Sequence, residues 1–292
     1  MHLRLAGCVC LVLGFAGCQV LAPVPIDVQR QKIPAALIED GKPQVEIGRR
    51  QPLIDGIGWV VGIPSKILLW DRRVDNHRIS EGTVLATADY LERNNLPHIK
   101  VRANQYAPIQ DWHRLRKNDA VAWPWRYSLG IVQLAGETIF PGRVFGGDHF
   151  NPFTQTVHLY SDVPAIALHE GGHAKDFTRR KYPGTYAAAY LFVPLWHETL
   201  ASQDVFAYLA SRGDVEGTME ANRILYPAYG TYVGNGLGYL VPKYATPVYY
   251  ASVLAGHANG RLLNRKLVTE APHPLPGPVI QGPVLPVNLG GD

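Results

Sequence analysis

The sequence predicts an α+β fold, in which a small sheet supports two long helices and a helical, glycine-rich C-terminal part. Two short segments, residues 99–102 and 155–160, alternate between apolar and polar side chains as strands do. Two long stretches with helical character follow, residues 163–180 and 185–212. The third observation is a stretch without any charge, residues 224–242, in which glycine recurs at every fourth position.

Length and composition limit the class of protein. The chain of 292 residues is long enough for one large or two small domains with a core. With 47% hydrophobic and 18% charged residues, a largely disordered chain is excluded. The net charge of +4 is small and no block of Lys and Arg occurs, so we expect no nucleic-acid partner. All three cysteines precede residue 19, so the remaining chain has no disulfide and no thiolate metal ligand.

The N-terminus has the features of an export signal, residues 1–17. Arg4 gives a positive start, and the apolar stretch 5–16 is short for a membrane span. The stretch ends in Phe15-Ala16-Gly17-Cys18, which resembles a bacterial lipobox and implies cleavage before Cys18 and its lipidation. Because no Asp follows Cys18, the resemblance implies the periplasmic face of the outer membrane. A plain signal peptide and an uncleaved anchor remain the alternatives.

Three further segments have recognisable composition. Residues 18–47 contain proline and charges without periodicity, and we expect a tether. Residues 52–70 are apolar and rich in glycine, but Asp55 and Pro64 disfavour a membrane span, so we expect a buried or interface-lying segment. Residues 269–292 are rich in proline and should form an extended tail.

The region before the long helices should hold short elements. Ser80 is a suitable cap for a helix over residues 81–94, because its hydroxyl can accept from a free backbone N–H. We expect a helical turn over residues 111–117. We expect strands over residues 127–134, 142–145 and 155–160. Further on, Pro183-Gly184 should separate the two long helices, and Pro194 should kink the second one.

The chemistry is carried by His169-Glu170-Gly171-Gly172-His173. On a helix, His169 and His173 differ by about 40° around the axis, so both imidazoles can reach one zinc ion. Glu170 lies about 100° from His169, where it can take a proton from zinc-bound water as the general base. Two glycines inside a helix are unfavourable, which indicates close approach of a strand or substrate, or tight packing of the next helix.

A hydrolytic zinc site usually has a third protein ligand. Arg179 stands where a third histidine of the metzincin type would be required, which excludes that arrangement. Glu198 lies on the expected second helix, at the distance along the chain that returns it to the level of the histidines. Apolar neighbours indicate that its carboxylate is buried and needs a partner. His197 and Asp204 are the competing candidates.

The motif together with Glu198 resembles the gluzincin metallopeptidases, over roughly residues 80–212. The resemblance implies a zincin-like metallopeptidase domain, assigned to residues 48–268, with Zn²⁺ as cofactor and a peptide or protein as substrate. It also implies that the strand before the motif helix, residues 155–160, forms the edge of the substrate cleft. The site would thus comprise His169, His173 and Glu198 as ligands and Glu170 as catalytic residue.

The resemblance also implies residues that support the metal ligands and a donor to the oxyanion. Many gluzincins carry an acidic residue four positions after the ligand glutamate, which supports a histidine ligand. Ser202 occupies that position here, so Ser202, Asp204 or Asp176 would take the supporting role. Tyr229 is the candidate donor to the developing oxyanion.

Two alternatives to a peptidase remain open. One is a non-catalytic envelope lipoprotein that keeps a structural zinc, and the other is a zinc amidase acting on the cell wall. The stretch 224–242 also has two interpretations. One is a membrane-inserted segment. The other, which we expect, is a helix whose glycines allow it to pack closely on one side of the helix that carries Glu198, called the glutamate helix below.

Overall fold

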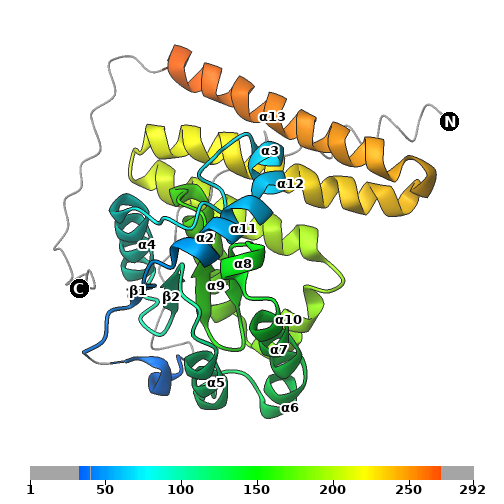
Figure 1. The fold of residues 1–292 in the computed structure, drawn as a ribbon. Coiled ribbons are helices and arrows are strands. Elements are labelled where there is room, and N and C mark those ends of the chain that lie inside the picture. The colour runs from blue at the N-terminus through cyan, green and yellow to red at the C-terminus, as the bar shows by residue number, and fades with distance from the viewer. Residues whose placement is uncertain (1–32, 40, 271–292) are drawn as a thin grey trace. The chain divides into compact units, whose positions relative to one another are not determined.

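The computed structural model describes residues 33–39 and 41–270, which form two compact units divided between Ala201 and Ser202 (Figure 1). The signal segment 1–17, Cys18 and most of the tether lie outside the described residues, as do residues 271–292 of the predicted tail. The first two residues of that tail, Thr269 and Glu270, are helical rather than extended. The assignment of residues 48–268 to a single domain stays a prediction.

The first unit contains a mixed four-stranded sheet, so the described chain is α+β and mostly helical, as predicted. The strand order is β1 (Val45–Ile47), β2 (Lys100–Ala103), β4 (Thr156–Leu159) and β3 (His149–Asn151). β1, β2 and β4 are parallel, and β3 pairs with β4 in the antiparallel direction. Since β1 lies within residues 18–47, the end of the predicted tether is part of the sheet.

Helices make up most of the remaining first unit. Ser80 caps α4 as predicted, accepting a hydrogen bond from the Thr83 backbone N–H at 3.4 Å. The helical elements of this unit are η2 (Ala35–Leu37), α2 (Pro52–Val61), α3 (Ile63–Leu69), α4 (Glu81–Arg93), α5 (Pro108–Lys117), α6 (Trp123–Trp125), η3 (Arg126–Gly130), α7 (Ile131–Ile139), α8 (Gly142–Phe145), α9 (Pro164–Thr178), α10 (Pro183–Ala189) and the first part of α11 (Pro194–Ser211).

Two predicted strands were wrong. Residues 127–134 belong to η3 and α7, and residues 142–145 form the short helix α8. Short apolar runs do not distinguish strand from helix by periodicity. Here Leu134 packs into an apolar core with Leu115 and Phe177, while Val132 points to solvent, which is a helical pattern. The predicted helix over 185–212 is divided as well, because Pro194 begins α11 rather than kinking a continuous helix.

The sheet has one apolar and one polar buried face. Val101, Val157 and Leu159 are buried on the apolar side. On the other face, one side chain from each strand lies in register across the sheet, and these form the polar row: Glu46, Arg102, His158 and His149.

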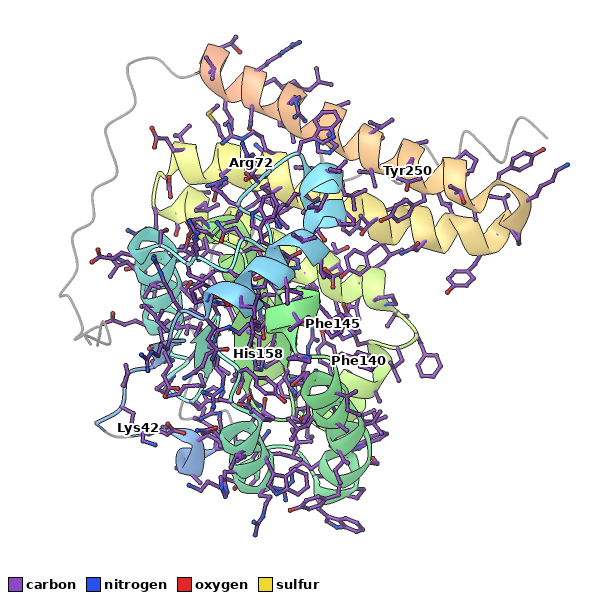
Figure 2. The ribbon with its side chains drawn as sticks, viewed as in Figure 1. Lys42, Arg72, Phe140, Phe145, His158 and Tyr250 are labelled. Atoms are coloured by element: carbon purple, nitrogen blue, oxygen red, sulfur yellow. The ribbon has the colours of Figure 1, made fainter. Side chains whose placement is uncertain are left out.

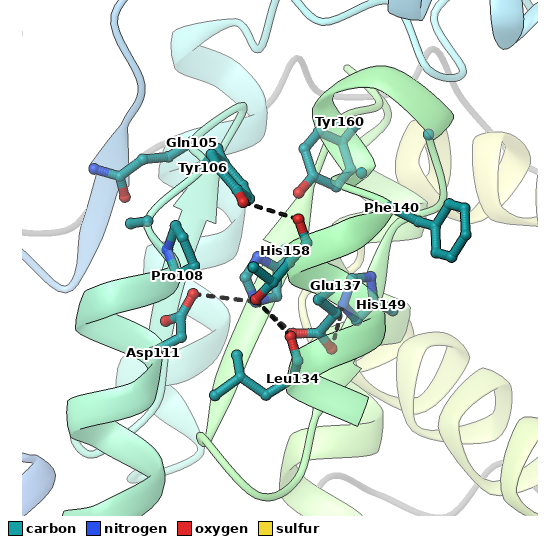
Figure 3. Close-up of a pocket in the computed structure, with 14 residues that line it drawn as sticks. Gln105, Tyr106, Pro108, Asp111, Leu134, Glu137, Phe140, His149, His158 and Tyr160 are labelled. Atoms are coloured by element: carbon teal, nitrogen blue, oxygen red, sulfur yellow. Dashed lines mark hydrogen bonds and ion pairs between the residues drawn. The ribbon is translucent and has the colours of Figure 1, made fainter. Parts of the chain in front are cut away.

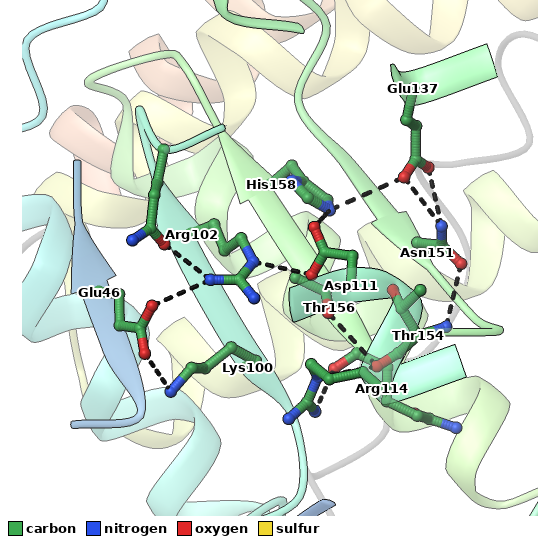
Figure 4. A network of polar contacts seen from close by, with 12 residues as sticks. Glu46, Lys100, Arg102, Asp111, Arg114, Glu137, Asn151, Thr154, Thr156 and His158 are labelled. Carbon is green, nitrogen blue, oxygen red and sulfur yellow. Dashed lines mark hydrogen bonds and ion pairs between the residues drawn. The ribbon is translucent and has the colours of Figure 1, made fainter. Parts of the chain in front are cut away.

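Ion pairs balance the charges of the polar row (Figure 4). Buried Arg102 donates to Asp111 of α5 at 2.8 Å and to Glu46 at 2.9 Å. Lys100 lies 2.6 Å from the other Glu46 oxygen. Removing one member would leave a buried charge without its partner, so the row should be sensitive to substitution.

The segment 52–70 forms α2 and α3, and much of its apolar surface is exposed rather than buried. Leu53, Val60 and Ile67 are 78%, 58% and 67% exposed. Exposed Phe140 and Phe145 are labelled in Figure 2, and their rings make an edge-to-face contact at 5.5 Å. Among the described helices, none alone has the length and apolar character to cross a membrane, whereas α2 and α3, bent by 50°, meet that criterion as a pair.

The second unit is dominated by the helices α12 (Val215–Leu240) and α13 (Ala245–Glu270), which are joined by η4 (Pro242–Tyr244). The glycines of α12 meet α13 in antiparallel order, Gly230 at Ser252, Gly234 at Tyr249 and Gly238 at Ala245. Close packing at these glycines was therefore predicted correctly, but the nearest neighbour is α13 and not the glutamate helix. The turn at Pro242 lets the chain return directly along α12.

Replacing Gly234 with leucine should lower the free energy of unfolding by about 1–3 kcal/mol. A Cβ atom at this position would lie 2.7 Å from the Tyr249 Cα, so the two backbones would have to separate. Asn235→Leu adds the same side chain at the adjacent exposed position and serves as the control. Denaturant unfolding of both variants checks the prediction, and equal stability of the two would contradict the close packing.

Candidate metal centre

The motif His169-Glu170-x-x-His173 lies on α9, as the sequence predicts. α9 begins at Pro164, whose fixed φ suits the first helical position, and it packs against α4 and β3. The Nε2 atoms of His169 and His173 are 3.1 Å apart, and their rings are nearly perpendicular. One ligand atom each from His169, Glu170 and His173 lies within 4.8 Å of the others, so this group could hold a metal ion.

Glu198 of α11 completes the arrangement. Its carboxylate oxygens lie 3.0 Å from His169 Nε2 and 3.4 Å from His173 Nε2. The side chain is buried, as its apolar neighbours indicate. Of the three candidates for the third ligand, Glu198 is the one that the described contacts place against both histidines.

The two motif glycines explain how the helices come so close. A Cβ atom at Gly172 would lie 2.9 Å from the backbone oxygen of Ala201 on α11, so glycine allows the glutamate helix to approach. A Cβ atom at Gly171 would lie 2.7 Å from the ring of Tyr90 on α4. Of the explanations offered for these glycines, helix packing is therefore the one observed on both sides of α9.

The donor set fits zinc. Two imidazole nitrogens and one carboxylate oxygen are the ligands that hydrolytic zinc sites use. Ligand atoms at about 2.0–2.1 Å from a tetrahedral ion are about 3.3 Å apart. The separations of 3.0, 3.1 and 3.4 Å lie within a few tenths of an ångström of this value.

The surroundings of Glu198 favour its ionised form, which is the form that binds a metal ion. Burial alone would raise the pKa of Glu198, but hydrogen bonds from His169 and His173 and their charge hold that pKa well below its ordinary value. For His173, burial opposes the charged form, but Glu198 outweighs it and raises the pKa. Glu198 is thus an anion at neutral pH, which is the form that binds a cation.

Tyr190 is the residue at this site that sequence reasoning missed. It lies in the connection between α10 and α11, and its hydroxyl donates to Glu198 Oε1 at 2.6 Å. No motif marks it, because the contact depends on how this connection folds back. His197, the competing ligand, packs against Tyr186 and Tyr190 with ring centroids 4.3 and 5.2 Å away.

The structure also describes where the predicted supporting residues and the predicted oxyanion donor lie. Asp176 accepts from Arg180 at 2.6 Å and from the Tyr186 hydroxyl. Ser202 is buried on α11 and Asp204 is on the same helix. Tyr229 lies on α12 in the second unit. Their proposed roles stay predictions.

The edge of the sheet was assigned to the wrong strand. The predicted cleft edge, residues 155–160, corresponds to β4, which lies between β2 and β3. The end of the sheet beside α9 is β3, a three-residue strand that follows a glycine pair. Such a short strand has too few residues for an alternating pattern, so the sequence did not predict it.

The pKa of His149 on β3 is raised to about 9. Burial lowers this pKa, but Glu137, the Gly147 carbonyl and, more weakly, Glu170 outweigh the burial. β3 therefore lies within electrostatic range of the motif.

Comparison of the chain with protein families, with curated proteins and with solved structures gives no match.

Proposed function

We propose that this protein is a zinc-dependent peptidase of the gluzincin kind. The observation that supports the proposal most strongly is the convergence of His169, His173 and Glu198, whose ligand atoms are 3.0–3.4 Å apart. Glu170 accompanies them, with a carboxylate oxygen within 4.8 Å of both histidines. A purely structural zinc site would not require this additional carboxylate.

The reaction follows from the positions of the side chains. Zinc, when bound, supplies a Lewis acid that lowers the pKa of water to about 7 and polarises a carbonyl group. Glu170 follows His169 on the motif helix and lies about 100° from it around the axis, so we assign its carboxylate to accept the proton of the attacking water. It then delivers this proton to the amine that leaves.

Two other elements would assist. Tyr190 donates to the Glu198 oxygen at 2.6 Å and is a positioning residue, because it orients the ligand rather than the substrate. β3 ends the sheet next to α9, where an extended peptide can add by backbone hydrogen bonds. A peptide bound in this way runs past the motif helix, which is why we favour a peptide substrate.

The N-terminal sequence adds a location to this proposal. Cys18 would carry the lipid that holds the protein at the periplasmic face of the outer membrane. Since an acyl chain contributes about 0.8 kcal/mol per buried methylene, several chains would give stable attachment.

The substrate class can be tested directly. Zinc-loaded protein is incubated with an unfolded protein and, separately, with isolated cell-wall fragments, and new amino groups are quantified. We expect cleavage of the unfolded protein that a chelator abolishes. Cleavage of cell-wall fragments alone would replace this proposal with the amidase, and no cleavage of either would favour the non-catalytic lipoprotein.

A further inference from the structure

Four potential metal ligands surround a cavity at one end of the polar row (Figure 3). They are Asp111 of α5, Glu137 of α7, His149 of β3 and His158 of β4. All four line a cavity of about 70 Å³. One ligand atom each from Glu137, His149 and His158 lies within 4.8 Å of the others, so this group could hold a metal ion.

His158 provides the observation that points to a ligand. The side chain is buried, and its Nε2 has no hydrogen-bond partner in the described protein. A buried polar atom without a hydrogen-bond partner destabilises the folded protein. The nearest charged atoms are Asp111 Oδ2 and Glu137 Oε2, both at 4.0 Å.

That distance leaves room for an ion between the atoms. A separation of 4.0 Å is too long for a hydrogen bond, and it exceeds by about 0.7 Å the spacing of about 3.3 Å between ligand atoms around a tetrahedral zinc ion. An ion between His158 and the carboxylates would satisfy Nε2 and would need only small movements of the side chains.

The surrounding hydrogen bonds orient the other ligands. His149 donates through Nδ1 to the Gly147 carbonyl at 2.9 Å, which directs Nε2 toward Glu137 at 3.0 Å. Asn151 donates to both Glu137 oxygens at 2.9 and 3.0 Å. Such backbone and amide partners are typical of groups that support metal ligands.

Asp111 is oriented in a similar way. Arg102 holds Asp111 Oδ1 at 2.8 Å, which leaves Oδ2 facing His158. Two carboxylates balance the charge of a divalent cation, and two imidazoles with two carboxylates form a set that zinc accepts in tetrahedral geometry.

We propose that Asp111, Glu137, His149 and His158 form a second zinc site, separate from the one on α9 and α11. Four protein ligands leave no position open for a substrate, so this site is structural. Its ligands come from two helices and two strands, and the ion therefore ties α5 and α7 to the end of the sheet.

Zinc stoichiometry tests the proposal independently of catalysis. The full chain and its variants are dialysed against buffered zinc, and bound metal is measured by elemental analysis. We expect two zinc ions per chain in the wild type, and one in His158→Gln, in Glu137→Gln and in His173→Ala. His113→Gln replaces an exposed histidine of α5 and should keep both ions.

The outcomes separate the two sites. If the wild type binds one ion and His158→Gln and Glu137→Gln also bind one, the second site is refuted. If His158→Gln and Glu137→Gln lose an ion while His173→Ala does not, the second site stands and the proposed catalytic site fails. Circular dichroism of each variant shows whether a loss of metal reflects unfolding.

Discussion

Glu170→Gln should reduce peptide hydrolysis by about 10²–10⁴-fold while the zinc content stays unchanged. Glutamine has nearly the same shape as glutamate but cannot accept a proton at neutral pH. Because the three ligand atoms come from His169, His173 and Glu198, the substitution leaves the proposed metal site complete. The loss should therefore appear in kcat rather than in metal binding.

The measurement compares the kcat and zinc content of purified wild type and variant. Glu92→Gln makes the same chemical change at an exposed position of α4 and should keep full activity. Full activity in Glu170→Gln would show that another group takes the proton. A fall in zinc content together with activity would place Glu170 among the ligands instead.

Glu198→Ala should weaken zinc binding at the α9–α11 site by at least about 100-fold. Losing a group that only supports a ligand already costs about 10–100-fold in affinity, and Glu198 is proposed as a ligand itself. The substitution also leaves the Tyr190 hydroxyl without its acceptor. Measuring zinc affinity in a His158→Gln background restricts the signal to this site.

His197→Phe is the matched control for the choice of ligand. His197 is adjacent to Glu198 in sequence and is the principal competitor, but its ring packs among Tyr186 and Tyr190. Its Nε2 has no hydrogen-bond partner in the described protein, so phenylalanine can replace the ring without breaking a bond at that atom. Zinc affinity should stay unchanged. If His197→Phe lost zinc and Glu198→Ala retained it, the third ligand would be assigned wrongly.

Features governed by local rules could be predicted from the sequence. The spacing of His169 and His173 is a property of any helix, and the Ser80 cap depends on residues within one turn. Glu198 was placed by assuming one continuous helix after Pro183-Gly184. The structure divides this segment into α10 and α11, yet Glu198 lies against both histidines. The glycines of α12 likewise indicated a close neighbour, although not that α13 would be this neighbour.

Short elements were less predictable, because their sequences suit more than one structure. Residues 127–134 are apolar enough for a strand, and the burial of Leu134 against Leu115 and Phe177 selects the helix. β3 is three residues long, and its pairing with β4 rather than any pattern makes it a strand. The sequence therefore could not predict that β3 forms the edge of the sheet.

The sequence by itself determined that two histidines share one face of a helix with a glutamate about 100° from the first of them, and that a second carboxylate follows among apolar residues. Only the tertiary structure decided that Tyr190 donates to Glu198, and that Asp111, Glu137, His149 and His158 meet around one cavity. Those four residues come from four separate elements. Helical periodicity relates residues within a few positions of one another, whereas contacts between elements depend on packing and strand register, which no local pattern encodes.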